Sequence, residues 1–205
     1  ARAAKKRADR RVQILRAAID VFAERGYHGA SIDDIIARAD IARGTFYLYF
    51  ASKAAVFGSI LDDALDGLTR SIRPVELDDP AAPPPQLQLR ENLARVLGYL
   101  TEDRARAAVL LARNVVHEAE AAERLDAFYA RVRELLMCAL GHGIAMGLVR
   151  PCDVAVTAAG LLGMARGMLE LVVLGAENRQ PAAADANAVI DAILDTGLRG
   201  IVKIY

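Results

Sequence analysis

The sequence predicts an all-α protein, and three observations lead to this fold class. Alanine, the residue with the highest helix propensity, accounts for 40 of the 205 residues, and there is no Trp. Apolar residues recur three and four positions apart over most of the chain, which is the period of one helix face. No segment shows the apolar–polar alternation of a half-buried strand. An apolar fraction of 54% also excludes a disordered chain.

The first helix is expected over about residues 9–25, because apolar side chains recur there at helical spacing and Gly26 provides a stop. Shorter pieces follow. Ser31 and Asp34 have the spacing of a capping box before a helix that ends near Ala39. Asp40, which tolerates a left-handed backbone, occupies a turn, and a second short helix is expected over residues 43–50.

Longer helices are expected in the rest of the chain. One begins at Ser52 and runs to about residue 72, where a stretch with five of the seven prolines predicts a loop over residues 74–85. Beyond this loop the periodicity predicts helices over about residues 86–100, 102–117, 119–146, 153–174 and 185–203.

Charge divides the chain into two parts although the formal net charge is zero. Residues 1–53 contain 11 basic and 6 acidic side chains, and residues 54–205 contain 15 and 20. We therefore expect a basic domain over residues 1–53, with a basic arm at 1–11, and a larger domain over residues 54–205. A basic arm is typical of proteins that bind nucleic acid or an anionic membrane. Taken alone it is also compatible with a solubilising tail.

Two short helices joined by a turn of about three residues have the geometry of a helix-turn-helix. In the second helix Phe46 and Phe50 are four apart and can face inward. Arg43, Thr45 and Tyr47 then face outward, where guanidinium and hydroxyl groups suit base edges and phosphates. The alternative is a small three-helix core closed by an aromatic plug.

The same region resembles the DNA-binding signature of the TetR/AcrR family of transcriptional regulators. The resemblance rests on residues 14–27 (ILRAAIDVFAERGY), 31–35 (SIDDI), 41–50 (IARGTFYLYF) and Ser52-Lys53. It implies a three-helix DNA-binding head, a six-helix ligand-binding body, and a homodimer built mainly on the last two helices. Such a protein binds a palindromic operator.

Carried over by position, the resemblance assigns DNA contacts to seven residues, of which Ser31 and Lys53 would contact phosphates. The set is Ser31, Arg43, Gly44, Thr45, Tyr47, Tyr49 and Lys53. Three positions depart from the family pattern. Asp40 replaces a turn glycine, Ala42 replaces a capping serine, and Ile36 replaces a small residue between the two short helices.

An apolar stripe on the helix predicted over 119–146 is interpreted either as core or as the wall of a ligand pocket. Its members are Leu125, Phe128, Val132, Leu135, Ala139, His142 and Met146. The pocket interpretation gives eight candidate ligand-binding residues, which are Phe57, Leu61, Tyr99, Asn114, His117, Phe128, Cys138 and His142. Apolar walls with a few polar groups suit a small apolar or aromatic effector.

Small residues at helical spacing on the helix predicted over 153–174 indicate a close subunit contact. Together with the family resemblance they give the candidate dimer residues Gly160, Gly163, Arg166, Gly167, Glu170, Ile190 and Leu194. Arg166 and Glu170 are four apart and can form an ion pair.

No catalytic motif is present: the sequence contains no P-loop, nucleophile elbow, paired-cysteine zinc spacing or HExxH. We therefore expect no enzyme, metal or cofactor. With two cysteines, no signal peptide, and Arg166 and Glu170 inside the longest apolar segment, we expect a cytoplasmic protein without a membrane partner.

The leading hypothesis is a ligand-responsive repressor that binds DNA as a homodimer. The alternative is a helical small-molecule-binding protein or enzyme whose head serves protein contacts only.

Overall fold

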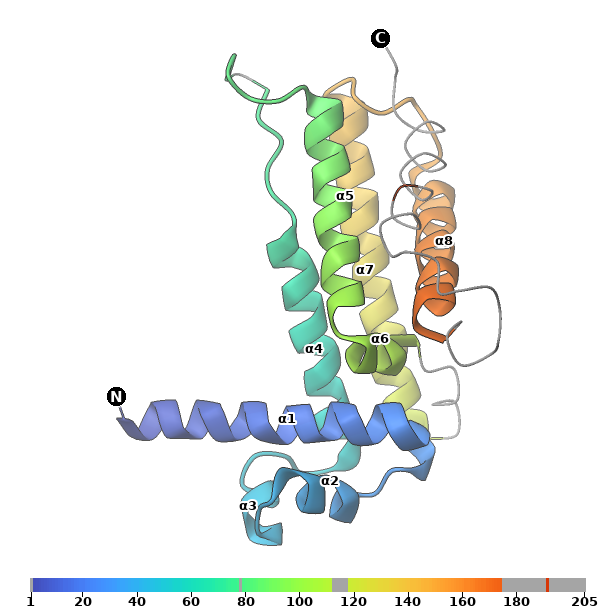
Figure 1. Ribbon diagram of the computed structural model, residues 1–205. Helices are drawn as coiled ribbons and strands as arrows, with labels where there is room; N and C mark the ends of the chain where they lie inside the picture. Colours follow the sequence, from blue (N-terminus) through green and yellow to red (C-terminus); the bar gives the residue numbers. More distant parts are fainter. Residues whose placement is uncertain (1, 78, 112–117, 175–190, 192–205) are drawn as a thin grey trace. The chain divides into compact units, whose positions relative to one another are not determined.

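The computed structural model describes residues 2–77, 79–111, 118–174 and 191, and it confirms the all-α prediction (Figure 1). Eight helices and no strand lie within these residues: α1 (Arg2–Gly29), α2 (Ile32–Ala39), α3 (Arg43–Tyr47), α4 (Lys53–Ser71), α5 (Pro85–Glu102), α6 (Arg104–Leu111), α7 (Ala119–Ala145) and α8 (Val154–Leu174). Of the helix predicted over 185–203, only residue 191 is among the described residues.

Most helix boundaries agree with the sequence prediction, and three differ. Helix α1 begins at Arg2 rather than near residue 9, because the Ala, Arg and Lys residues of the arm are themselves good helix formers. Gly26 interrupts α1 as a kink with φ 70° and ψ 162°, and one more turn follows it. Helix α3 ends at Tyr47, earlier than the predicted residue 50. The loop predicted from the proline cluster is confirmed, since α4 ends at Ser71 and α5 begins at Pro85.

The chain forms two compact units. We call residues 1–64 with 105–128 the N-terminal unit, and residues 65–104 with 129–205 the C-terminal unit. Helices α4 and α7 each contribute residues to both units. The domain boundary expected after residue 53 stays a prediction.

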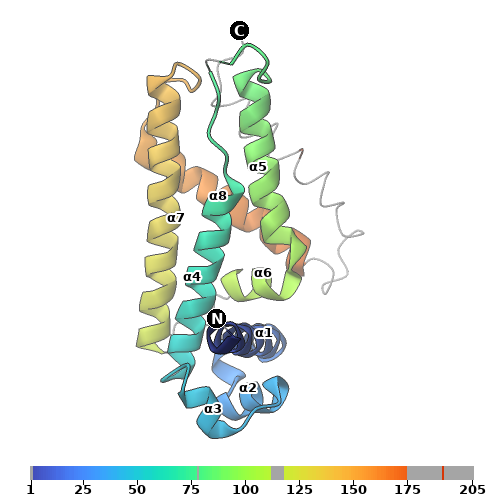
Figure 2. The same cartoon turned by 90° about the vertical axis from the view of Figure 1, so that its left-hand side faces the viewer.

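The N-terminal unit is built around α1. In two perpendicular views α2 and α3 lie on one side of α1 and α6 lies on the other (Figures 1 and 2). The core between these helices contains Ile14, Ile35 and Phe46, all with no exposed side-chain area. Burying a large apolar side chain contributes about 1.5–3 kcal/mol, so this core fixes α2 and α3 on α1.

An aromatic cluster of Phe22, Tyr27 and Phe57 connects α1 to α4. The Tyr27 ring centre lies 5.3 Å from that of Phe22 and 4.9 Å from that of Phe57. The Phe22 and Phe57 rings meet edge to face at 6.0 Å. Such contacts hold the beginning of α4 against the end of α1.

The C-terminal unit is held by contacts of α5, α7 and α8. Leu140, Val149 and Ala158 form a buried cluster on α7, α8 and the turn between them. Tyr99 of α5 packs against Gly67 of α4 so closely that a Cβ at position 67 would overlap its ring.

The proline-rich segment is tied to the beginning of α5. The buried Gln88 side chain donates to the Glu76 and Pro83 carbonyl oxygens and accepts from the Glu76 N–H.

Among the residues that the structure describes, no helix has the length and apolar character needed to cross a membrane.

Candidate nucleic-acid interface

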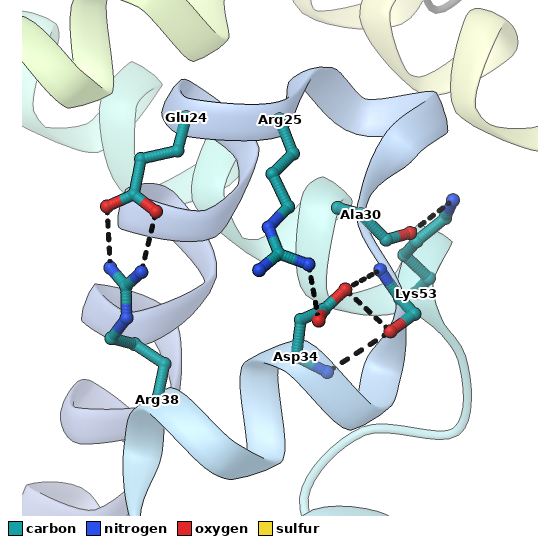
Figure 3. Close-up of polar contacts among 7 residues, drawn as sticks. Glu24, Arg25, Ala30, Asp34, Arg38 and Lys53 are labelled. Carbon is teal, nitrogen blue, oxygen red and sulfur yellow. Dashed lines mark hydrogen bonds and ion pairs between the residues drawn. The ribbon is translucent and has the colours of Figure 1, made fainter.

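Helix α2 starts with the predicted capping box (Figure 3). The Ser31 hydroxyl accepts from the Asp34 N–H at 3.1 Å and donates to Asp34 Oδ2 at 2.7 Å, and the Ser31 N–H also donates to Oδ2. These bonds from Ser31, with a smaller contribution from Arg25, hold the pKa of Asp34 below its ordinary value. The hydroxyl proton of Ser31 is thus used inside the chain, and the phosphate contact expected of Ser31 stays a prediction.

Two ion pairs join α2 to α1. Arg25 contacts Asp34 at 2.6 Å, and both terminal nitrogens of Arg38 contact the Glu24 carboxylate, at 2.9 and 2.6 Å (Figure 3). The hydrogen bond from Arg38 lowers the pKa of Glu24. A two-point Arg–carboxylate contact fixes orientation as well as distance, so α2 has a defined direction on α1.

The turn between α2 and α3 has the left-handed residue predicted from the sequence. Asp40 has φ 49° and ψ 58°, and within the described residues it is the one non-glycine with positive φ. Its N–H donates to the last carbonyls of α2. Ala42, the N-cap of α3, offers no side-chain hydrogen bond, as expected for an alanine where a serine is common. The N-terminal N–H groups of α3 therefore have no side-chain cap.

Helix α3 presents its polar face outward, as predicted. Phe46 and Phe50 are buried, with 0% and 5% of their area exposed. The exposed residues are Arg43, Gly44, Tyr47 and Leu48, while Thr45 and Tyr49 are half-buried. Nothing within 4 Å would contact a Cβ at Gly44, so the surface beside this glycine is open.

Arg43 is held loosely over the exposed face of α3. Its Nη1 lies 2.6 Å from Asp33 Oδ1, and its guanidinium carbon lies 6.0 Å from the centre of the Tyr47 ring. The hydrogen bond to Asp33 raises the pKa of Arg43. The side chains of Arg43 and Asp33 are 64% and 69% exposed. Ion pairs this exposed add little stability, so the guanidinium is available to another acceptor.

Lys53 is held tightly in the interior. Its Nζ donates to the carbonyl oxygens of Tyr27 at 2.9 Å and Ala30 at 3.1 Å, and to Glu118 Oε1 at 3.0 Å (Figure 3 shows Lys53 beside Ala30). It also lies 4.3 Å from the centre of the Tyr27 ring. Only 16% of its side chain is exposed. The phosphate contact expected for Lys53 stays a prediction, and it requires at least one of these bonds to break.

Glu118 was not found by the sequence analysis. Partial burial acts to raise its pKa, but the hydrogen bond and charge of Lys53 outweigh burial and leave the pKa below its ordinary value. Burial, and then the Glu118 carboxylate, raise the pKa of Tyr27 well above its ordinary value. No sequence signal indicates this contact, because Glu118 and Lys53 are 65 positions apart.

The basic arm is the exposed beginning of α1. Arg2, Lys5, Lys6 and Arg7 are all exposed and form no ion pair with the described residues, whereas Arg11 pairs with Asp63 at 3.3 Å. Four cations on one exposed helix leave a positive surface available to a polyanion.

The candidate ligand-binding residues are divided between the two units. Phe57, Leu61 and Phe128 are buried in the N-terminal unit, where Phe57 belongs to the aromatic cluster described above. Tyr99 is half-buried in the C-terminal unit. Asn114 and His117 lie outside the described residues.

The apolar stripe predicted on α7 is not buried along the whole helix. Phe128 is buried, but Cys138, Ala139, His142 and Met146 are exposed, so the second half of the predicted stripe does not line the interior. Leu136, Leu140 and Ile144 pack against α8 and the turn before it instead, because this competing row is the one that meets Val149 and Ala158. Cys138 Sγ lies 3.8 Å from His142 Nδ1 on the exposed side.

The candidate dimer residues of α8 are partly exposed. Gly160, Gly163 and Gly167 are exposed, and the expected ion pair between Arg166 and Glu170 is present at 3.5 Å. Ile190 and Leu194 lie outside the described residues.

The described part of the chain has no group of three or more His, Cys, Asp or Glu residues that could hold a metal ion.

Comparison with known families identifies the chain. Residues 14–60 match the bacterial regulatory proteins of the tetR family, and residues 88–200 match the C-terminal domain of AefR-like transcriptional repressors. The second match alone spans more than half of the chain. The chain belongs to the TetR family. Its members are transcriptional regulators and not enzymes, as the sequence predicted.

Two curated relatives match part of this TetR-family chain. The transcriptional repressor DhaR of Mycobacterium sp. (strain GP1) is 39% identical over 80 residues, which are 39% of this chain and 39% of the relative. The transcriptional activator FasR of Mycolicibacterium smegmatis is 39% identical over 67 residues, which are 33% of this chain and 31% of the relative. The chain thus matches less than half the length of each.

A solved structure covers nearly the whole chain. A putative TetR-family regulator from Syntrophomonas wolfei superposes with a TM-score of 0.77 at 24% identity, over 93% of this chain and 94% of that one. This similarity establishes the TetR fold, with its helix-turn-helix head and helical body.

Proposed function

We propose that this TetR-family chain is a ligand-responsive repressor that binds a palindromic operator as a homodimer and is released from it by a small apolar or aromatic effector. The observation that carries the proposal is the exposed polar face of α3, held on the buried rings of Phe46 and Phe50. A helix that exposes Arg43, Gly44 and Tyr47 fits the major groove of DNA.

Within this interface the residues have different roles. Arg43 reads a base edge, because its exposed guanidinium can exchange Asp33 for a guanine. The hydroxyl groups of Thr45, Tyr47 and Tyr49 bind phosphates beside it. Gly44 allows the backbone of α3 to approach the DNA closely, since no side chain separates it from the surface.

The homodimer is supported by the exposed small residues of α8. Gly160, Gly163 and Gly167 let two helix backbones approach closely, and Val156 on the same helix is 69% exposed. Exposed apolar and small residues of this kind indicate an interface with another chain. A twofold dimer presents two identical α3 helices, which is why the operator is an inverted repeat.

The repressor role is supported by the C-terminal match to AefR-like repressors and by the relative DhaR. The curated relatives alone do not determine this role, because the activator FasR has the same identity over its matched residues as DhaR. The apolar or aromatic effector is supported by Phe57, Tyr99 and Phe128, which are the Phe and Tyr residues among the ligand candidates. Acting on DNA, the protein works in the cytoplasm.

The test is a salt titration of binding to the DNA upstream of the chain's own gene. Counterion release makes log K fall with log [salt] by about 0.9 for each phosphate neutralised. We expect a steep slope and footprints at two half-sites related by twofold symmetry. Weak binding that does not change with salt would instead support the alternative, in which the head serves protein contacts only.

A further inference from the structure

The hydrogen bonds of Lys53 leave it no free donor. A lysine ammonium has three N–H groups, and three acceptors surround this one at 2.9–3.1 Å: two carbonyl oxygens and the Glu118 carboxylate. The two carbonyls belong to Tyr27 and Ala30, which lie at the end of α1 and just before the N-cap of α2. Lys53 therefore joins the first turn of α4 to the segment that leads into the helix-turn-helix.

Glu118 supplies the only charge that balances Lys53 in this group of contacts. Its Oε1 lies 3.0 Å from Lys53 Nζ and 3.6 Å from His28 Nδ1. Glu118 directly precedes α7, so its position depends on the beginning of that helix. The segment before α2 is thus connected to α7 through one lysine.

A second contact fixes α7 on α4 in the same unit. The guanidinium of Arg124 lies against Gly58, where a Cβ would be only 2.6 Å from Arg124 Nη1. Residues 119–128 of α7 belong to the N-terminal unit, and residues 129–145 of the same helix belong to the C-terminal unit. A rotation or shift of α7 against α4 displaces Glu118 relative to Lys53, because Glu118 directly precedes α7 and Lys53 begins α4.

We propose that Lys53 and Glu118 form a latch that positions the helix-turn-helix for DNA and transmits movement of α7 to it. In this proposal, which rests on the proposed function, both are positioning residues and neither contacts DNA. When Glu118 moves away, Lys53 keeps two neutral acceptors and loses its counter-charge, which favours its departure to solvent. Residues 27–30 then lose their link to α4, and the α2–α3 arrangement that fits DNA becomes less populated.

The experiment compares four variants with the wild type: Lys53→Met, Glu118→Gln, the double variant, and Lys6→Met. Lys6→Met removes the same charge from an exposed position of the same unit and serves as the matched control. Binding to the upstream duplex and to a random-sequence duplex of the same length is measured at several salt concentrations. Amide hydrogen exchange of residues 27–35 is measured without DNA.

The sign of the Glu118→Gln effect distinguishes the latch from simple electrostatics. Removing a negative charge from a DNA-binding protein strengthens binding if only charge matters. The latch predicts weaker binding to the upstream duplex, by about fivefold or more. It also predicts that Lys53→Met weakens binding without changing the salt slope, and that the double variant is no weaker than Lys53→Met.

Several outcomes would overturn the proposal. Tighter binding by Glu118→Gln would contradict it, and so would additive effects in the double variant. A salt slope about 0.9 lower for Lys53→Met would also contradict it, because that change indicates a lost phosphate contact. Exchange of residues 27–35 must rise in both single variants and stay unchanged in Lys6→Met. Unchanged exchange refutes the latch whether or not DNA binds. A wild type without salt-dependent DNA binding refutes the proposed function instead, and with it the role of the latch in DNA binding.

Discussion

Replacing Gly44 by alanine separates the stability of α3 from its contact with DNA. Position 44 lies in the first turn of α3, its φ is not positive, and no atom within 4 Å would touch an added Cβ. Alanine is the better helix former, so Gly44→Ala stabilises the fold by about 0.5 kcal/mol. For a chain of this size that corresponds to a rise in melting temperature of about 1–2 °C.

The same methyl group should weaken DNA binding. If the backbone of α3 approaches DNA at Gly44, the added methyl overlaps the DNA surface. Overpacking a close contact typically costs about 1–3 kcal/mol, which is about 5- to 150-fold in affinity. Calorimetric melting and binding to the upstream duplex would be measured on the same preparation.

Gly98→Ala provides the matched control. Gly98 lies inside α5, and a Cβ there also has open space. We expect this variant to be stabilised without any change in DNA affinity. A Gly44→Ala variant that binds DNA as tightly as the wild type would refute a close approach at this position. A variant that melts lower would show that the space beside Gly44 is not open.

Three further outcomes are expected. Arg43→Ala should lose about 5- to 150-fold in operator affinity and relax the preference at one position of each half-site, measured by binding to a set of operator variants; equal losses on every sequence would make Arg43 a phosphate contact. Ala42→Ser should stabilise the fold by about 1 kcal/mol in chemical denaturation, because Ala42 is an N-cap without a side-chain hydrogen bond; no change would mean that the serine does not cap α3. The lowered pKa of Glu118 predicts that the stability difference between wild type and Glu118→Gln is constant at neutral pH, shrinks as the pH falls below the ordinary pKa of glutamate and disappears as it falls through the lowered pKa; a difference that does not change with pH would contradict the pairing with Lys53.

Features that depend on neighbours in sequence could be predicted. The capping box needs only residues three apart, and the turn at Asp40 needs only a residue that tolerates a left-handed backbone. The inward direction of Phe46 and Phe50 follows from their spacing of four. For these features the local chemistry and the final structure favour the same conformation.

Features that depend on distant contacts could not be predicted. The stripe on α7 was assigned from periodicity over 22 residues, yet two apolar rows compete on that helix, and contacts with Val149 and Ala158 select the other row in its second half. The ring contacts of Phe57 with Phe22 and Tyr27 also join residues that are far apart in the sequence, and the ligand contact expected for Phe57 stays a prediction. Periodicity shows which residues share a face but not which element covers it.

Arg43 and Lys53 are two basic residues of one sequence motif that differ in exposure and in their contacts. The family resemblance assigns both to DNA, but 64% of the Arg43 side chain is exposed and only 16% of the Lys53 side chain. An exposed ion pair such as that of Arg43 costs little to break, so its guanidinium can move to a base or phosphate. Breaking the contacts of Lys53 takes the ammonium away from the half-buried Glu118 carboxylate and from two carbonyl oxygens, which is costly. The exposed guanidinium of Arg43 is therefore suited to a contact with DNA. The ammonium of Lys53, whose three N–H groups are all bonded, is suited to holding the segment before α2 in place, and thereby the helix-turn-helix that includes Arg43.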